Sequence, residues 1–402
     1  MTLPSLFLKK NEQRRLRAGH LWIYSNEVDT HKSPLTAFEA GQQVTVRNSY
    51  GDAVGNAYVN PNALICGRLF SRDAATRLDT PLLTERLRAA LTLRETLFED
   101  PYYRLAFSEG DGLPGLIVDR YDTVAVVQIT TAGMERCKAG IVQALTQLIN
   151  PAAVVMRNDN EARAVEGLDS SVEIAAGTLP AQVVVEENGA RFEIDPLAGQ
   201  KTGWFYDHRM NRARMQHYVR GKTVLDVFSY IGGWGVQAAL AGARQVLCVD
   251  GSDTALERLR YNAAHNQVEQ NIQTQCGDAF TLLKGLHTEA RRFDVIVLDP
   301  PAFIKRKKDM AAGTEAYQRL NHLALRLLND DGVLISSSCS YHMAESTLQN
   351  TLLKAARPAG HTLQLIERGH QAPDHPMHPA MTENNYLKTL FMRVLTGQPF
   401  HW

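Results

Sequence analysis

The sequence predicts an α/β fold, with a Rossmann-like, doubly wound sheet in its C-terminal half and two smaller units before it. From residue 196 onwards, short apolar strands alternate with helical segments. Such alternation is typical of a parallel sheet covered by helices on both faces. Residues before 196 show short strands and turn signals instead. At 402 residues the chain is also too long for one compact core, so two or three domains are expected, and the pattern along the chain divides it into three.

The first domain is expected over residues 1–75 and is β-rich. A short basic helix over 12–17 precedes the strands. Strands are expected at 44–47, 53–59 and 64–69. A turn is expected at 49–52, and residues 60–62 break the pattern between the last two strands.

The second domain is expected over residues 76–195 and mixes helices with strands, as a small central α+β domain. Leucines at helical spacing predict a helix over 81–97, and a second amphipathic helix is expected over 133–148. Strands are expected at 113–120, 124–131, 153–157, 183–187 and 191–194. Asn188-Gly189 predicts a tight hairpin turn between the last two.

The third domain, 196–402, carries the alternating pattern. Strands are expected at 223–227, 245–249, 272–275, 293–298, 333–337, 362–367 and 386–394. Helices are expected at 235–241, 253–266, 279–286, 314–328 and 343–356.

Composition narrows the class of protein without naming a function. The 43 basic and 43 acidic residues balance, so any nucleic-acid partner must be bound by local patches. No apolar run has the length of a membrane span, and no secretory signal is evident. Five scattered cysteines without a CxxC pair indicate reduced thiols and a cytoplasmic protein. The histidines of the 370–378 loop match no zinc pattern, so no metal is predicted.

Four acidic residues follow or end successive strands of the predicted sheet: Asp226, Asp250, Asp278 and Asp299. Ligands of doubly wound sheets bind at the carboxyl ends of the strands. Asp250 suits both ribose hydroxyls of an adenosine group, and Asp278 suits the adenine amino group. Asp226 would face the charged end of the ligand.

The turn after the first strand, residues 228–235, argues against a dinucleotide. It lacks G-x-G-x-x-G, and Trp234 would crowd a pyrophosphate. A nucleoside without phosphates fits better, and S-adenosylmethionine is the expected cofactor. The residues expected to bind it are Asp226, Phe228, Tyr230, Gly232, Gly233, Asp250, Ser252, Asp278 and Ala279.

Cys339 follows an apolar strand directly, and Asp299 follows another. A thiol and a carboxylate at the carboxyl ends of parallel strands would face one crevice. Such a pair suggests covalent chemistry on a planar heterocycle, because a thiolate is a strong nucleophile that also leaves readily. An arbitrary cysteine is more often an inert buried thiol, but its place opposite Asp299 favours a catalytic role.

Several distinctive segments together resemble one family: 109–119, 199–209, 226–234, 299–303, 338–340, 374–376 and 386–388. They are similar to class I S-adenosylmethionine-dependent methyltransferases. More narrowly, the chain resembles large-subunit ribosomal RNA (cytosine-C5)-methyltransferases of the RlmI type over essentially its whole length.

The resemblance implies an N-terminal PUA domain, a central α+β domain and a C-terminal methyltransferase domain. It also implies methylation of a cytosine in 23S ribosomal RNA, free or in a precursor subunit, with Cys339 as nucleophile and Asp299 holding the base. By the same resemblance, the loop of Gln200, Lys201, Thr202 and Gly203 would cover the methyl donor and bind it. RNA contacts are expected from Arg15, Arg17, Trp22, Phe303, Lys305, Arg306, Lys307 and Lys308.

Two other functions stay open on the sequence alone. One is an RNA methyltransferase that modifies another atom, such as a guanine nitrogen, and needs no thiol. The other is a non-catalytic RNA-binding or ribosome-assembly factor on the same fold. The sequence also leaves open the base that removes the C5 proton and the oligomeric state, for which a homodimer is one alternative.

Overall fold

The computed structural model describes residues 2–395. The chain divides into two compact units. Unit 1 holds residues 1–185, 194–206 and 373–384, and unit 2 holds 186–193, 207–372 and 385–402. Each unit is described by itself.

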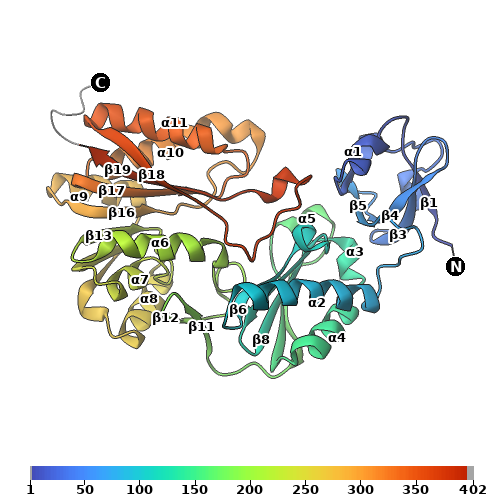
Figure 1. The fold of residues 1–402 in the computed structure, drawn as a ribbon, viewed down its shortest axis with the longest axis horizontal. Helices are drawn as coiled ribbons and strands as arrows, with labels where there is room; N and C mark the ends of the chain where they lie inside the picture. Colours follow the sequence, from blue (N-terminus) through green and yellow to red (C-terminus); the bar gives the residue numbers. More distant parts are fainter. Residues whose placement is uncertain (1, 396–402) are drawn as a thin grey trace. The chain divides into compact units, whose positions relative to one another are not determined.

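Unit 1 contains two five-stranded sheets, whose elements are shown in Figure 1. The first sheet has the order β1-β3-β4-β5-β2, from β1 Ser5–Phe7, β2 Trp22–Tyr24, β3 Gln42–Arg47, β4 Ala53–Val59 and β5 Ile65–Ser71, with helix α1 Gln13–Arg17. A cluster that includes Leu6, Ile23 and Val44 fills its interior. The expected strands were therefore found, but the short β1 and β2 were not predicted from the sequence.

The second sheet of unit 1 has the order β10-β9-β8-β7-β6. Its strands are β6 Tyr102–Phe107, β7 Leu116–Tyr121, β8 Val124–Ile129, β9 Ala153–Asn158 and β10 Ser171–Gly177. Its helices are α2 Thr80–Leu97, α3 Ala132–Glu135, α4 Lys138–Ile149 and α5 Ala162–Val165. The prediction of a single helix over 133–148 is wrong, because the helix is interrupted at Arg136 and Cys137, which lie between α3 and α4.

A separate hairpin joins β11 Val183–Glu187 to β12 Ala190–Ile194. Asn188 and Gly189 at its turn have φ of 53° and 83°. Positive φ at both central residues is what a two-residue type I′ turn requires, so the predicted turn is confirmed.

Unit 2 is a seven-stranded sheet of order β15-β14-β13-β16-β17-β19-β18. Its strands are β13 Thr223–Val227, β14 Gln245–Asp250, β15 Ile272–Cys276, β16 Phe293–Leu298, β17 Leu328–Ser338, β18 Thr362–His370 and β19 Lys388–Leu395. β13 to β17 run parallel, whereas β19 is antiparallel to β17 and to β18. β14 lies on one side of β13 and β16 lies on the other side. The strand order therefore reverses between β13 and β16.

Helices cover both faces of this sheet, as expected (Figure 1). They are α6 Arg209–Val219, α7 Gly235–Leu240, α8 Asp253–His265, α9 Ala279–Thr288, α10 Met310–Leu325 and α11 Glu345–Ala356. α10 packs against α9 and α11 on one face, and α7 packs against α6 and α8 on the other. The helix expected over 314–328 is wrong at both ends, because Met310 begins it and Leu328 already belongs to β17.

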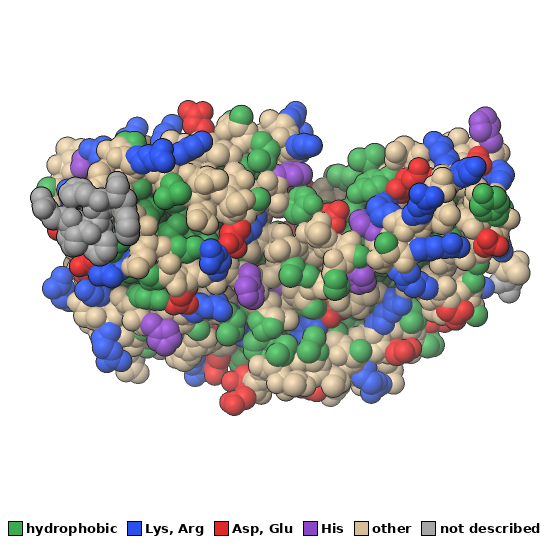
Figure 2. All heavy atoms as spheres, turned by 45° about the horizontal axis from the view of Figure 1, so that its top comes forward, with side chains coloured by type: hydrophobic (Ala, Val, Ile, Leu, Met, Phe, Trp, Pro, Cys, Tyr) green, Lys and Arg blue, Asp and Glu red, His purple; other side chains and the backbone are tan. Residues whose placement is uncertain are grey.

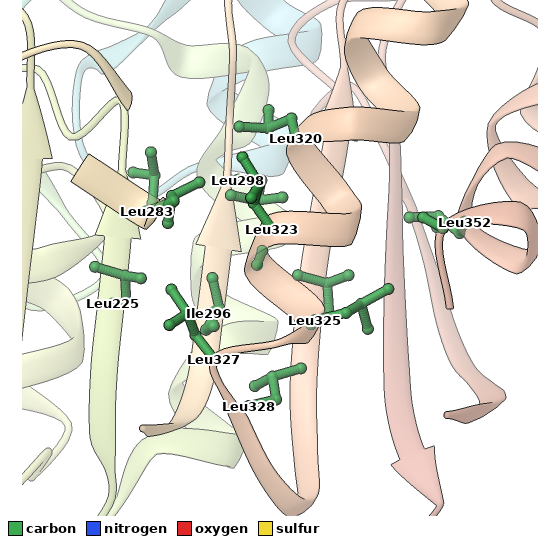
Figure 3. Close-up of a cluster of buried hydrophobic side chains, with 14 of the residues drawn as sticks. Leu225, Leu283, Ile296, Leu298, Leu320, Leu323, Leu325, Leu327, Leu328 and Leu352 are labelled. Atoms are coloured by element: carbon green, nitrogen blue, oxygen red, sulfur yellow. The ribbon is translucent and has the colours of Figure 1, made fainter. Parts of the chain in front are cut away.

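Leucine and isoleucine side chains hold α9, α10 and the central strands together. Figure 3 shows Leu225 of β13, Ile296 and Leu298 of β16, and Leu320 and Leu323 of α10 in one cluster. Leu225, Ile296, Leu298 and Leu320 are fully buried. Each such burial stabilises the fold by about 1.5–3 kcal/mol relative to exposure. This core fixes the strands whose carboxyl ends form the site.

Figure 2 shows basic and acidic side chains interspersed over the face in view. No helix in the described part of the chain has both the length and the apolar character needed to cross a membrane. Among the same residues, no group of three or more His, Cys, Asp or Glu side chains could hold a metal ion.

Candidate active site

The carboxyl ends of the parallel strands in unit 2 carry the candidate site. Asp226 lies in β13, Asp250 ends β14, Asp299 follows β16 and Cys339 follows β17. Parallel strands end at one edge of a sheet, so these side chains share the edge at which strand order reverses.

The turn after β13 has an unusual backbone. Phe228 and Tyr230 have φ of 68° and 48°, a left-handed conformation that bulky residues rarely adopt. The strain is held by hydrogen bonds, because the Phe228 N–H donates to the Val249 carbonyl at 2.8 Å and the Tyr230 N–H donates to Asp250 Oδ2 at 2.8 Å. Strained residues of this kind occur at ligand sites.

Glycines in the same turn leave no room for side chains. A Cβ on Gly232, whose φ is 96°, would lie 2.8 Å from the Val236 side chain. A Cβ on Gly235 would lie 2.4 Å from Cys248 Sγ. The turn therefore requires glycine at both positions and packs tightly onto the start of α7.

Asp226 is fully buried beneath this turn. Its Oδ2 accepts a hydrogen bond from the Gly235 N–H at 2.9 Å, whereas its Oδ1 has no hydrogen-bond partner among the described residues. Burial, followed by the nearby charge of Asp299, raises the pKa of Asp226 to about 8. A buried oxygen without a partner is costly, so this atom is suited to a polar group of a bound ligand.

Asp250 is held in place with acceptor capacity to spare. Its Oδ1 accepts from the Ser252 N–H at 2.9 Å, and its Oδ2 accepts from the Tyr230 N–H. Each carboxylate oxygen has a second lone pair, so Asp250 can still accept bonds from two ribose hydroxyls. Ser252 itself caps α8 by accepting from the Ala255 N–H at 3.2 Å.

Asp278 caps α9, which was not foreseen from the sequence. Its Oδ1 accepts from the Thr281 N–H at 2.9 Å and from the Thr281 hydroxyl at 2.8 Å. The bonds from Thr281 lower the pKa of Asp278. Ala279 is buried in the hydrophobic core, and a role for Asp278 in binding an amino group of a ligand stays a prediction.

Asp299 makes two side-chain contacts that sequence reasoning missed. His208 Nε2 lies 3.1 Å from Oδ1, and the Trp234 indole N–H donates to Oδ2 at 3.1 Å. Burial raises the pKa of Asp299, but the charge and hydrogen bond of His208 and the bond from Trp234 outweigh it, so the pKa is lowered. Asp299 is therefore held as an ionised acceptor.

Cys339 is half-buried, and its Sγ lies 4.0 Å from the Pro300 carbonyl oxygen. Since Pro300 follows Asp299 directly, the thiol lies beside the turn that begins with Asp299 after β16. The two neighbours of Cys339 are fixed by one side chain, because the Tyr317 hydroxyl bonds to Ser338 Oγ at 3.0 Å and to Ser340 Oγ at 3.1 Å.

Lys388 also lies at this end of β17. Its Nζ donates to the Ser340 carbonyl at 2.7 Å and to the Tyr386 carbonyl at 2.8 Å. Neither Lys388 nor His208 was predicted as a site residue, although both lie in segments that resemble the methyltransferase family. A lysine that begins a buried strand was the available signal for the first.

The predicted segment 200–203 lies in unit 1. Thr202 is fully buried there, and its hydroxyl donates to Asp119 and contacts the Tyr121 hydroxyl at 3.1 Å. The Lys201 ammonium lies 4.0 Å from the centre of the Phe205 ring. A role for this segment in binding the methyl donor stays a prediction.

Two of the predicted RNA-binding residues in unit 1 make internal contacts. The Arg15 guanidinium donates to both oxygens of Glu27, at 2.7 and 2.8 Å. The Trp22 indole donates to Glu109 Oε1 at 2.7 Å. Arg17 ends α1 with an exposed side chain, so it is the most accessible of the three for a phosphate.

The basic run 305–308 in unit 2 is exposed throughout, with Arg306 3.6 Å from Asp309. Phe303, just before it, is half-buried, and its ring centre lies 4.8 Å from that of Tyr317. Phe303 therefore packs partly inside the domain, whereas the lysines are available to solvent.

Comparisons with known proteins agree with this architecture. The profile of the S-adenosylmethionine-dependent methyltransferase family matches residues 124–393, and that of the PUA-like domain matches residues 6–72. The chain is 37% identical over 392 residues to ribosomal RNA large subunit methyltransferase I of Shewanella frigidimarina, spanning 96% of this chain and 98% of that protein. It is 35% identical over 396 residues to the protein of the same name from Aliivibrio fischeri, spanning 97% and 99%.

Solved structures show the same fold at lower identity. A protein designated SMU.776, solved in complex with SAH, is 21% identical with a TM-score of 0.84, covering 98% of this chain and 100% of that one. A Streptococcus mutans protein described as a SAM-dependent methyltransferase is 21% identical with a TM-score of 0.83 over the same shares. With a PUA-like domain, a methyltransferase domain and near-full-length relatives at more than 30% identity, the chain belongs to the S-adenosylmethionine-dependent methyltransferase family that includes the ribosomal RNA large subunit methyltransferase I proteins.

Proposed function

We propose that this protein methylates carbon 5 of a cytosine in the 23S RNA of the large ribosomal subunit. Relatives that match nearly the whole chain are named as large-subunit ribosomal RNA methyltransferases. The observation that carries the choice of target atom is Cys339, whose thiol lies beside the turn that follows β16.

The thiol is what methylation of carbon 5 needs. That carbon is a poor nucleophile in cytosine, but addition of a thiolate to carbon 6 makes carbons 4 and 5 enamine-like. Carbon 5 then takes the methyl group that S-adenosylmethionine supplies, and S-adenosylhomocysteine leaves. A base then takes the proton from carbon 5, and the electrons of the broken C–H bond expel the Cys339 thiolate and restore the aromatic ring.

Asp299 is proposed to hold the cytosine during this addition. As an ionised acceptor it suits the exocyclic amine of the base. Charge develops on ring nitrogen 3 as the thiolate adds to carbon 6, and a proton there would neutralise it. The pair of His208 and Asp299 can supply and hold that proton, because His208 Nε2 must carry a proton to bond the ionised carboxylate.

The methyl donor is proposed to bind along the turn after β13. Asp250 would accept from its ribose, Asp278 from its adenine and Asp226 from its charged end, with Ser252 and Gly233 beside them. Phe228, Tyr230, Gly232, Ala279 and the segment 200–203 remain proposed contacts of the same ligand.

The RNA is proposed to be held by exposed basic residues. Lys305, Arg306, Lys307 and Lys308 would bind phosphates next to the target, and Arg17 would bind RNA in the PUA-like domain. The cytosine must leave its stack to reach Cys339, at a cost of a few kcal/mol. A cytoplasmic location belongs to the same proposal, since ribosomal RNA and a reduced thiol are both required.

The decisive experiment measures transfer of a labelled methyl group from S-adenosylmethionine to large-subunit RNA. The wild type is expected to form 5-methylcytosine, and Cys339→Ala is expected to abolish turnover. Cys137→Ala, a thiol change in unit 1, is the matched control and is expected to remain active. Full activity of Cys339→Ala would instead favour another target atom, such as a guanine nitrogen.

A further inference from the structure

Lys388 is a buried cation beside the carboxyl end of β17, the strand that Cys339 follows. It begins β19 and pairs with Ser338 of β17 in the antiparallel ladder. Its exposed fraction is 7%. Its ammonium donates to the carbonyls of Ser340 and Tyr386, so one of its two acceptors belongs to the residue that follows Cys339.

Within the described part of the chain, the buried ammonium of Lys388 does not have the ion-paired carboxylate that usually offsets the cost of burying a charge. Two carbonyl oxygens satisfy part of its hydrogen-bonding capacity, but no carboxylate lies within ion-pair distance of Lys388 among residues 2–395. Burial lowers the pKa of Lys388 to about 8, and the opposing effect comes from the negative charge of Cys339. The buried ammonium of Lys388 is therefore stabilised when the Cys339 thiol is ionised.

The other titratable groups around Lys388 come from three elements. Tyr317 of α10 bonds the serines on either side of Cys339, and burial raises its pKa. His370 of β18 pairs with Lys388, and its Nδ1 contacts the Gln371 carbonyl at 2.7 Å. The Tyr386 hydroxyl donates to Asp207 at 2.6 Å. None of these contacts places an anion against Nζ.

On the side of Cys339, the Pro300 carbonyl that contacts the thiol belongs to the residue directly after Asp299, and Tyr341 and His342 follow the thiol in the chain. Asp299 is bound to His208 and Trp234. Tyr341 and His342 continue the chain with their rings 5.1 Å apart. The Asp299 carboxylate disfavours a second negative charge at this end of the sheet, and a nearby cation opposes that effect.

We infer that Lys388 is a positioning residue whose ammonium stabilises the thiolate of Cys339. The inference rests on the proposed function, in which Cys339 attacks carbon 6, and it names the cation that prepares the nucleophile. The ammonium is fixed through the Ser340 carbonyl to the loop that bears the thiol, and Tyr317 fixes the serines on both sides. Loss of the ammonium proton with rising pH would therefore remove support from the thiolate.

The test follows the alkylation of Cys339 by iodoacetamide as a function of pH, read peptide by peptide in a mass spectrometer. Because alkylation requires the thiolate, its pH midpoint reports how readily Cys339 ionises, without any RNA or methyl donor. Lys388→Met is expected to move that midpoint upward by about one pH unit, which is about a tenfold lower rate below the midpoint. Lys388→Arg, which keeps the charge, is expected to restore the wild-type rate.

Two controls separate this effect from a general one. Exposed Cys276 reports in the same samples and is expected to keep its midpoint. Lys354→Met removes an exposed lysine of α11 and is expected to change neither thiol. An unchanged Cys339 midpoint in a folded Lys388→Met protein would overturn the inference.

A second measurement decides the matter if Lys388→Met does not fold. By reciprocity, removing the thiolate must change the titration of Lys388 as much as Lys388 changes that of the thiol. NMR of the lysine side chain is expected to show a lower titration midpoint in Cys339→Ser than in the wild type. Equal midpoints would overturn the inference. Failure to methylate RNA, in contrast, would overturn the proposed function and leave both titrations as predicted.

Discussion

Asp299 Oδ1 lies 3.1 Å from His208 Nε2, at the end of the strand next to the one that bears Cys339. The bond from Trp234 to the second oxygen completes the support of this carboxylate. His208 therefore links the start of α6 to the proposed base-binding acid, and its contact controls the charge of Asp299.

His208→Ala is expected to move the acidic limb of the methylation pH profile to higher pH. The charge and hydrogen bond of His208 lower the pKa of Asp299, so their loss lets the carboxylate take a proton at higher pH. A protonated Asp299 no longer accepts from the base. The pH dependence of kcat/KM measures this. His217→Ala, an exposed histidine within α6, should leave the limb in place, and an unmoved limb in His208→Ala would count against the role of Asp299.

Asp226→Asn is expected to gain stability relative to the wild type as the pH rises. The pKa of Asp226 is raised to about 8 in the folded protein, so its contribution to stability is present below the unfolded pKa and is lost as the pH rises towards 8. Asparagine does not ionise and escapes this loss. The difference in free energy of unfolding should change by at most about 1.4 kcal/mol per pH unit. Denaturant unfolding at several pH values measures this difference in free energy of unfolding. A difference that does not change with pH would contradict a raised pKa of Asp226 in the folded protein.

Asp250→Ala is expected to weaken the binding of S-adenosylmethionine by about tenfold to a hundredfold, the loss of one or two hydrogen bonds to a charged group. It removes the acceptor of the Tyr230 N–H as well, so the strained turn loses its support. Calorimetry measures the dissociation constant. Asp253→Ala, three residues further on and exposed, is the matched control and should bind normally. Equal affinities for the two variants would exclude Asp250 from the cofactor site.

Joint replacement of Lys307 and Lys308 by alanine is expected to lower the affinity for RNA and to make that affinity less dependent on salt concentration. Both side chains are exposed, so their removal should not affect the fold. For each phosphate that the variant no longer neutralises, the slope of log affinity against log salt should fall by about 0.7 for single-stranded RNA. Lys354→Ala is the control. An unchanged slope would mean that the basic run 305–308 does not contact RNA.

The alternation of strands and helices made the sheet of unit 2 predictable from the sequence, because each buried strand is a short apolar run bounded by turn residues. The boundary between α10 and β17 was not, since Leu327 and Leu328 continue the apolar pattern of the helix. The strands β1 and β2 were also not predictable, because each is too short to show an alternation of apolar and polar residues. Their three residues are held in place by pairing with β3 and β5.

The chemistry-bearing residues at the strand ends were predictable because parallel strands end at one edge. Their partners were not, because the contacts of His208 with Asp299 and of Lys388 with Ser340 join residues distant in the chain. Asp278 shows a different difficulty, since a carboxylate after a strand serves equally as a helix cap or as a ligand contact.

The most direct test of the account maps 5-methylcytosine by mass spectrometry in 23S RNA from cells with and without this protein. One site is expected to lose its methyl group in cells that lack the protein. Wild-type protein should restore it, and Cys339→Ala should not. Unchanged methylation at every site, or full restoration by Cys339→Ala, would contradict a covalent cytosine-C5 methyltransferase.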